Sequence, residues 1–249
     1  MSKLRGWIPN LFTLANLTFG FLAILLCFQS RGNPGILSMA GGMILLAVLC
    51  DGLDGFAARL LNASSELGAQ LDSLADLTAF GIAPGALMYS LVLHNYTLPL
   101  SPDVNFPIGM LIASVFPICA AYRLARFNVQ HISDSFSGLP SPVAGSIVGL
   151  MPLISGDILN IPDWVFALIF VLSAFLMVST VKYSKPQVSR RFTPVRLGIL
   201  MVFLILALIF IGIKYNFTYS FMGIFFISFI YIVSGLVSLI IQLIQKYRM

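Results

Sequence analysis

Four aspartates lie within one short stretch of the sequence, inside segments that are otherwise apolar. Asp51 and Asp54 are three residues apart, and Asp72 and Asp76 four apart, so each pair shares one face of a helix. A carboxylate at the centre of a membrane-spanning helix costs about 2.5–3.5 kcal/mol on insertion scales, so it needs a cation, a partner or water. Carboxylate oxygens suit Mg²⁺ or Mn²⁺. The pattern therefore predicts a cluster of four carboxylates holding two metal ions, an arrangement suited to phosphoryl chemistry.

Small residues share the faces of these aspartates. Gly55 and Ala58 follow Asp54, and Gly68 precedes Asp72 by about one turn. Small residues either leave room for a ligand or allow two membrane helices to pack closely. Arg59, one turn beyond Gly55, either binds a phosphate or extends to lipid headgroups.

The composition is that of an integral membrane protein. Of the 249 residues, 59% are hydrophobic and 9% charged, whereas soluble domains carry about 25% charged residues. Apolar segments fill nearly the whole chain, and no polar linker is long enough to separate domains. We expect one all-α membrane domain over residues 1–249. The net charge of +5 fits contact with a membrane surface, and no nucleic-acid partner is expected.

The apolar segments predict about eight membrane-spanning helices, since a span needs about 20 apolar residues. The expected helices are 9–28, 36–61, 67–93, 107–129, 141–156, 162–181, 195–213 and 218–245. The aspartates belong to the helical hairpin of about 36–93. The fifth helix is short, and it is retained because its loss would place the basic segment 182–196 on the opposite side from the other basic residues.

The basic residues predict the orientation, because short cytoplasmic loops are rich in Lys and Arg. With both termini inside, every Lys and Arg except Arg31 and Lys214 falls on the cytoplasmic side. The aspartates then lie near the cytoplasmic face of a multi-pass protein of the cell membrane. Soluble substrates would reach them from the cytoplasm, and lipids from the bilayer.

The hairpin also carries a family resemblance. Its pattern D-x-x-D-G-x-x-A-R-x8-G-x3-D-x3-D resembles the signature of the CDP-alcohol phosphotransferases, membrane enzymes that displace CMP from a CDP-linked alcohol. The resemblance implies that Asp51, Asp54, Asp72 and Asp76 bind the metal pair and that Asp76 is also the general base. It further implies that the nucleophile is a substrate hydroxyl, that the small residues make room for the nucleotide, and that the protein is a homodimer.

Other segments resemble the bacterial phosphatidylserine synthases within this family. They are I-P-N-L-F-T-L-A-N, R-L-A-R-F-N, F-S-G-L-P-S-P and M-V-S-T-V-K-Y-S-K. The resemblance implies phospholipid biosynthesis from CDP-diacylglycerol and L-serine. The CDP-lipid would then be bound by six residues, namely Thr13, Asn16, Gly55, Ala58, Arg59 and Gly68.

The remaining basic residues have two interpretations each. Arg123 and Arg126 either bind the serine carboxylate or anchor the cytoplasmic face, and Lys182 and Lys185 either bind lipid phosphate or anchor that face. The acceptor could also be glycerol 3-phosphate, an inositol phosphate or choline. A cation transporter is a further alternative, although the intramembrane acids are confined to one hairpin, whereas transporters often show paired broken helices or internal repeats.

Overall fold

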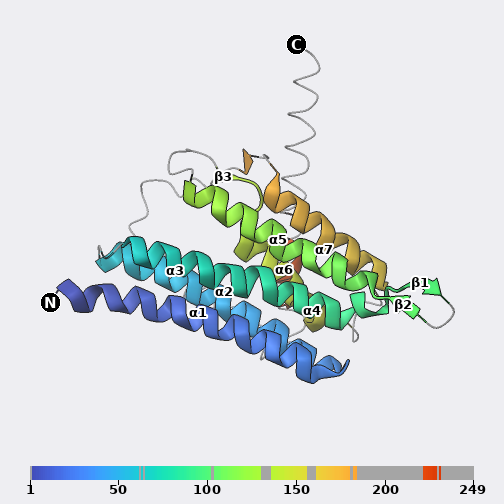
Figure 1. Cartoon of the computed structure of the whole chain (residues 1–249). Helices are drawn as coiled ribbons and strands as arrows, with labels where there is room; N and C mark the ends of the chain where they lie inside the picture. Colours follow the sequence, from blue (N-terminus) through green and yellow to red (C-terminus); the bar gives the residue numbers. More distant parts are fainter. Residues whose placement is uncertain are drawn as a thin grey trace, which may run out of the picture.

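The computed structural model describes most of the first 183 residues and a short segment near the C-terminus. The described residues are 2–61, 63, 65–101, 104–129, 136–155, 161–179, 182–183, 221–228 and 230. They form a bundle of helices lying side by side (Figure 1). The helices are α1 (Ser2–Ser30), α2 (Pro34–Leu61), α3 (Glu66–Leu77), α4 (Ala83–Leu91), α5 (Ile108–Val129), α6 (Ser141–Ile154) and α7 (Asp163–Val178).

The first six predicted helices are confirmed as helical segments. Five agree at both ends to within three residues, and α1 begins at Ser2, seven residues before the predicted start. The seventh, 195–213, lies outside the described residues, and only residues 221–228 and 230 of the eighth are described, all of them helical. Within the described part, α1, α2, the combined α3–α4 segment and α5 are long and apolar enough to cross a membrane. The total of eight spans and the sidedness of the membrane therefore stay predictions.

The helix α6 is short, and it lies largely in the interior of the bundle. Its 14 residues extend about 21 Å, less than the hydrocarbon thickness of about 30 Å. Most of its side chains are buried. The sequence identified this segment correctly as an apolar helix, and its interior position explains why it is apolar all round.

The third predicted span is one continuous rod with a wide turn in its middle. A π-helical turn, Thr78–Ile82, joins α3 to α4, and the amide of Ala83 donates to the carbonyl of Thr78. Pro84 lies at the start of α4, and it has no amide hydrogen for the carbonyl of the preceding turn. The wider turn immediately follows Asp76, so it sets the direction in which α4 leaves the aspartates.

Close packing between the helices depends on small residues. A side chain at Gly41 would collide with the backbone of Gly149, so α2 and α6 touch there. A Cβ at Gly20 would lie only 2.6 Å from the Cα of Ala79. Membrane helices commonly approach through such positions. α1 thereby packs against α2 and also against α3 and its π turn.

The expectation of a purely α-helical chain needs one correction. Two short antiparallel strand pairs occur in the connections: β1 (Leu98–Ser101) with β2 (Val104–Phe106), and β3 (Phe136–Ser137) with β4 (Lys182–Tyr183). The first pair projects from one end of the bundle, beyond α4 (Figure 1). Backbone groups outside helices still need hydrogen-bond partners, and short strand pairs supply them.

Candidate active site

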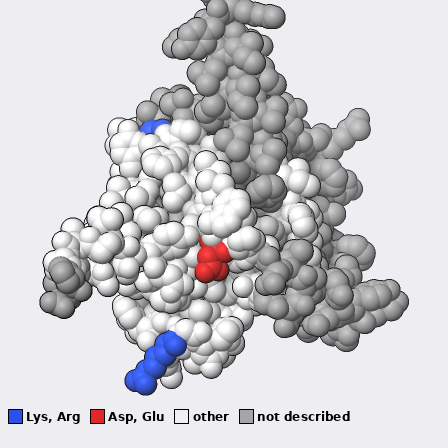
Figure 2. Space-filling model, turned by 90° about the vertical axis from the view of Figure 1, so that its right-hand side faces the viewer, with Lys and Arg blue, Asp and Glu red and all other residues white. Residues whose placement is uncertain are grey.

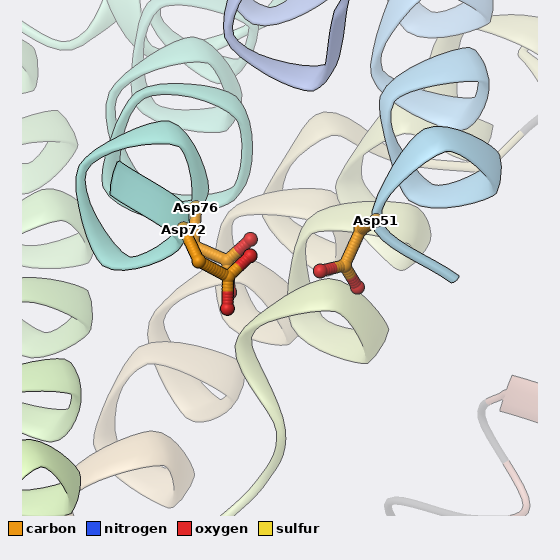
Figure 3. A group of neighbouring side chains, drawn as sticks. All are labelled: Asp51, Asp72 and Asp76. Atoms are coloured by element: carbon orange, nitrogen blue, oxygen red, sulfur yellow. The ribbon is translucent and has the colours of Figure 1, made fainter. Parts of the chain in front are cut away.

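Three of the four aspartates converge between α2 and α3. The carboxylates of Asp51, on α2, and of Asp72 and Asp76, on α3, offer oxygens that all lie within 4.8 Å of one another. Figure 3 shows the three side chains pointing into the gap between these two helices. The four-residue spacing of Asp72 and Asp76 places both on the same face of α3. α1 packs against both arms of the predicted hairpin, and the carboxylates face each other across the space between the arms.

Asp54 lies apart from these three. It is buried on α2, and its Oδ2 accepts a hydrogen bond of 2.9 Å from the hydroxyl of Thr13 on α1. Asp54 and Asp72 both line a small cavity next to the cluster. The predicted set of four carboxylates is therefore divided into a close group of three and a fourth that shares the cavity with Asp72.

The helix α1 supplies hydrogen-bond donors to this site. Thr13 and Asn16 are three residues apart and lie on one face of the helix. The Asn16 amide donates to Asp76 Oδ1 at 3.2 Å, and Asn16 is fully buried. Each of the two side chains thus fixes the orientation of one aspartate, Asp54 or Asp76.

The arrangement fits a divalent metal ion. Asp72 Oδ1 is buried and has no hydrogen-bond partner among the described residues, and an orphaned buried oxygen is costly unless something binds it. Carboxylates this close together repel one another, so a cation between them would lower the energy of the folded protein. Oxygen-only ligands of this kind match Mg²⁺ or Mn²⁺.

A cavity of about 180 Å³ adjoins the carboxylates. Four of the six residues predicted to bind the CDP-lipid line it: Thr13, Gly55, Ala58 and Gly68. Asn16 does not line it, because it is packed behind Asp76. Arg59 is exposed at the end of α2, and its guanidinium lies near Gly55.

Gly55 and Gly68 differ in what surrounds them. Among the described residues, a Cβ built on Gly55 would meet the Arg59 guanidinium alone, at 3.7 and 3.9 Å, which is ordinary contact. A Cβ on Gly68 would lie 3.0 Å from Ser65 Oγ, the atom that caps α3 by accepting from the Gly68 amide. The fold therefore does not require a glycine at position 55, whereas a side chain at position 68 would disturb the start of α3.

The two arginines of α5 have different surroundings. Arg123 is buried, its Nη1 donates to Ser141 Oγ at 2.8 Å, and its charge attracts that of Asp51. Arg126 donates to the carbonyls of Val178 and Ser179 at 3.0 and 3.4 Å, at the C-terminal end of α7. A cation is favourable at a helix C-terminus. The structure thus brings Arg123 toward the carboxylates and Arg126 onto α7.

Of the two lysines predicted to bind lipid phosphate, the structure describes only the backbone of Lys182. The backbone of Lys182 belongs to β4, where it pairs with Ser137, and its side chain is outside the described part. Lys185 lies outside the described residues altogether. Their proposed contact with lipid phosphate stays a prediction.

Comparison with known proteins identifies the family. A sequence model described as CDP-alcohol phosphatidyltransferase matches residues 6–240. The chain belongs to this family. As a CDP-alcohol phosphatidyltransferase it is an enzyme, and the family resemblance of its hairpin signature is confirmed.

Several curated relatives of this CDP-alcohol phosphatidyltransferase share the name CDP-diacylglycerol–serine O-phosphatidyltransferase. The protein of that name from Helicobacter pylori is 36% identical over 181 residues, covering 70% of each chain. The one from Bacillus subtilis is 36% identical over 179 residues, covering 72% of this chain and 90% of the relative. The one from Methanocaldococcus jannaschii is 32% identical over 179 residues, covering 72% and 74%.

The sequence alone did not assign some polar residues around the site of this phosphatidyltransferase, although it left Asn128 and Ser141 open as candidates for binding the serine amine. Asn10 and Ser65 line the cavity, and Ser141 is the partner of Arg123. Asn128 on α5 donates to Ser73 on α3 at 3.0 Å. The polar residue types were visible in the sequence, but turn and capping roles explained them equally well.

Proposed function

We propose that this enzyme transfers the phosphatidyl group of CDP-diacylglycerol to the hydroxyl of L-serine, giving phosphatidylserine and CMP. The observation that carries the proposal is the placement of three carboxylates beside a cavity lined by the residues of the CDP-alcohol signature. The names of the curated relatives support serine as the acceptor. The enzyme would act in phospholipid biosynthesis.

In the proposed reaction the serine oxygen attacks the phosphorus that carries diacylglycerol. The bond from this phosphorus to the oxygen of CMP breaks, and CMP leaves with the bonding electrons. The hydroxyl proton passes to Asp76, whose Oδ1 is held by Asn16 while its other oxygen accepts the proton. A carboxylate positioned in this way typically contributes a factor of about 10²–10⁴ in rate as a general base.

The aspartates have separate proposed roles. One divalent ion would be held by Asp51, Asp72 and Asp76. A second ion would be held by Asp54 and Asp72. The two ions would neutralise the charge of the pyrophosphate. Thr13 keeps Asp54 directed toward the cavity. Gly55, Ala58 and Gly68 leave space for part of the nucleotide, and Arg59 lies close enough to Gly55 to contact a phosphate.

Arg123 is the better candidate for binding the serine carboxylate. It is buried and its charge attracts that of Asp51, whereas Arg126 donates to the carbonyls of Val178 and Ser179 at the end of α7. Guanidinium groups bind carboxylates with charge-assisted hydrogen bonds. We therefore propose Arg123 as the acceptor-binding residue and a positioning role for Arg126.

The membrane orientation and assembly complete the proposal. The carboxylates would face the cytoplasm, as the distribution of basic residues predicts. Lys182 and Lys185 would contact lipid phosphates on that side. The homodimer implied by the family resemblance stays a prediction, which the mass of the purified protein in detergent would test.

The decisive experiment is a competition among acceptors. The purified chain is given CDP-diacylglycerol with Mg²⁺ or Mn²⁺ and either L-serine, glycerol 3-phosphate, an inositol phosphate or choline, and CMP release is measured. We expect release with serine. Release with another acceptor alone would replace serine while keeping the family chemistry. No release with any acceptor, together with metal-dependent ion flux in vesicles, would favour the transporter alternative.

A further inference from the structure

A second and larger cavity shares no lining residue with the small one beside the carboxylates. Its volume is about 670 Å³, and its walls come from the C-terminal end of α1, from the segment around α4, and from the first half of α5. On α1 it includes Cys27, whereas Thr13 belongs to the small cavity. With a rise of about 1.5 Å per residue, the two cavities lie about 20 Å apart along α1.

The walls of this larger cavity are mostly apolar. They include Phe28, Ile82, Ala86, Met110, Ala113 and Pro117. Two serines in the walls satisfy their hydroxyls locally: Ser30 donates to the carbonyl of Cys27 at 2.8 Å, and Ser114 to that of Leu111 at 2.7 Å. A cavity of this size and lining suits an apolar ligand or an apolar chain.

The wall also carries a cation. Arg31 is exposed and is the one Lys or Arg among the described residues that line the cavity. Figure 2 shows the end of the molecule where α1 ends, and its described surface is largely uncharged. An isolated guanidinium at the edge of an apolar cavity matches a molecule with an anionic head and an apolar chain.

The backbone at Arg31 adds an independent observation. Arg31 and Gly32 have φ angles of 46° and 82°, and the amide of Asn33 donates to the carbonyl of Ser30 at 2.7 Å, as in a type I′ turn. Arg31 is the one residue other than glycine with positive φ in the described part. This conformation is unfavourable for arginine and is often retained where a residue has a function.

The turn also fixes the position of the Arg31 backbone. The side chain of Asn33 accepts from the amide of Gly35 at 2.9 Å and thereby caps α2. Hydrogen bonds thus hold the connection between α1 and α2 at both of its ends, and they keep Arg31 beside the cavity. The predicted orientation also places Arg31 opposite every other basic residue except Lys214, so anchoring at the cytoplasmic face does not explain it.

We propose that this cavity binds one acyl chain of an anionic phospholipid whose phosphate pairs with Arg31. The bilayer that surrounds the helices supplies such molecules directly. The cavity shares no lining residue with the small one, and its wall residue Ile82 lies six residues beyond Asp76, about 9 Å along that helix. The site is therefore separate from the proposed substrate site, and a lipid bound there would brace the contact between α1, α4 and α5. Neither serine specificity nor the metal ions are needed for this inference.

The test measures lipid retention by the full chain in a neutral detergent, using native mass spectrometry. Phosphatidylglycerol and phosphatidylcholine with identical acyl chains are compared, and inorganic phosphate is tested alone. We expect the native chain to retain phosphatidylglycerol more tightly. Arg31→Gln should weaken that binding about tenfold, as for the loss of one charge-assisted contact. Arg5→Gln, which removes the same charge at the other end of α1, should not.

A second variant tests the apolar part of the cavity. Ala86→Phe, or Ser114→Phe if the first variant loses its helical circular dichroism, should fill the cavity and lower retention of both lipids. CMP release by Arg31→Gln should equal that of the native chain. Unchanged CMP release would show that the loss of lipid retention is independent of the proposed reaction.

Three outcomes would overturn the proposal. One is equal retention of the two lipids by the native chain. Another is displacement of phosphatidylglycerol by an equal concentration of inorganic phosphate, which would indicate an anion site without a chain. The third is a cavity-filling variant that separates subunits while lipid retention is unchanged, which would identify the cavity as an interface between copies.

Discussion

The two cavities of this membrane enzyme differ in how their polar side chains are used. Around the smaller one, polar groups reach across helices: Thr13 to Asp54, Asn16 to Asp76. Around the larger one, Ser30 and Ser114 bond to backbone carbonyls of their own helix, and most of the wall is apolar. Polar groups that hold one another across helices fix a geometry, as catalysis requires. Groups satisfied locally leave a surface suited to a lipid chain.

The largest expected effect tests whether the smaller cavity is the catalytic one. Asp76→Asn should lower CMP release with serine about 10³-fold, because an amide cannot accept the proton. Much of the metal binding should remain, since Asp51 and Asp72 are intact, and calorimetry with Mn²⁺ would measure it. The matched control is Glu66→Gln in the exposed first turn of α3. Near-native turnover of Asp76→Asn would remove its role as base.

The second prediction separates the two arginines of α5. Arg123→Gln should raise the KM for serine at least about tenfold, through loss of a charge-assisted pair, with little change in the KM for CDP-diacylglycerol. Arg126→Gln should leave both constants close to native and lower stability by about 1 kcal/mol through its lost bonds to α7. Steady-state kinetics and thermal unfolding measure the two effects. The reverse pattern would move the acceptor site to Arg126.

The third prediction concerns the support that α1 gives to the base. Asn16→Leu should lower kcat about tenfold through a less well-placed Asp76, with the KM values of both substrates little changed. Thr18→Val is the control, since the Thr18 hydroxyl donates to the carbonyl of Leu14 on an exposed face of the same helix. If instead the KM for CDP-diacylglycerol rises, Asn16 binds the CDP-lipid, as the sequence predicted.

The smallest expected effect on activity distinguishes glycines that make room for ligand from glycines that make room for helices. Gly55→Ala should raise the KM for CDP-diacylglycerol a few-fold without loss of stability, because the added methyl meets only the Arg59 guanidinium. Gly41→Ala should instead lower stability by about 1–3 kcal/mol, as expected for overpacking against Gly149. Thermal unfolding and kinetics on both variants would decide. Equal destabilisation would make Gly55 a packing residue.

Much of the fold followed from the sequence because its signals are local. Apolar runs of a fixed length predicted α1, α2, α5 and the long third span, since the thickness of the hydrocarbon region sets that length. The i, i+4 spacing likewise predicted that Asp72 and Asp76 share a face. The strand pairs were missed because their segments are very short and weakly patterned.

The sequence by itself determined the chemistry of the hairpin: which carboxylates exist, their helical spacing and the family signature that accompanies them. The tertiary structure decided which of these groups meet. It separated Asp54 from the close group, placed Asn16 behind Asp76 and directed Arg123 and Arg126 to different partners. Helical periodicity is a property of neighbouring residues, whereas contacts between distant helices depend on how their side chains interlock.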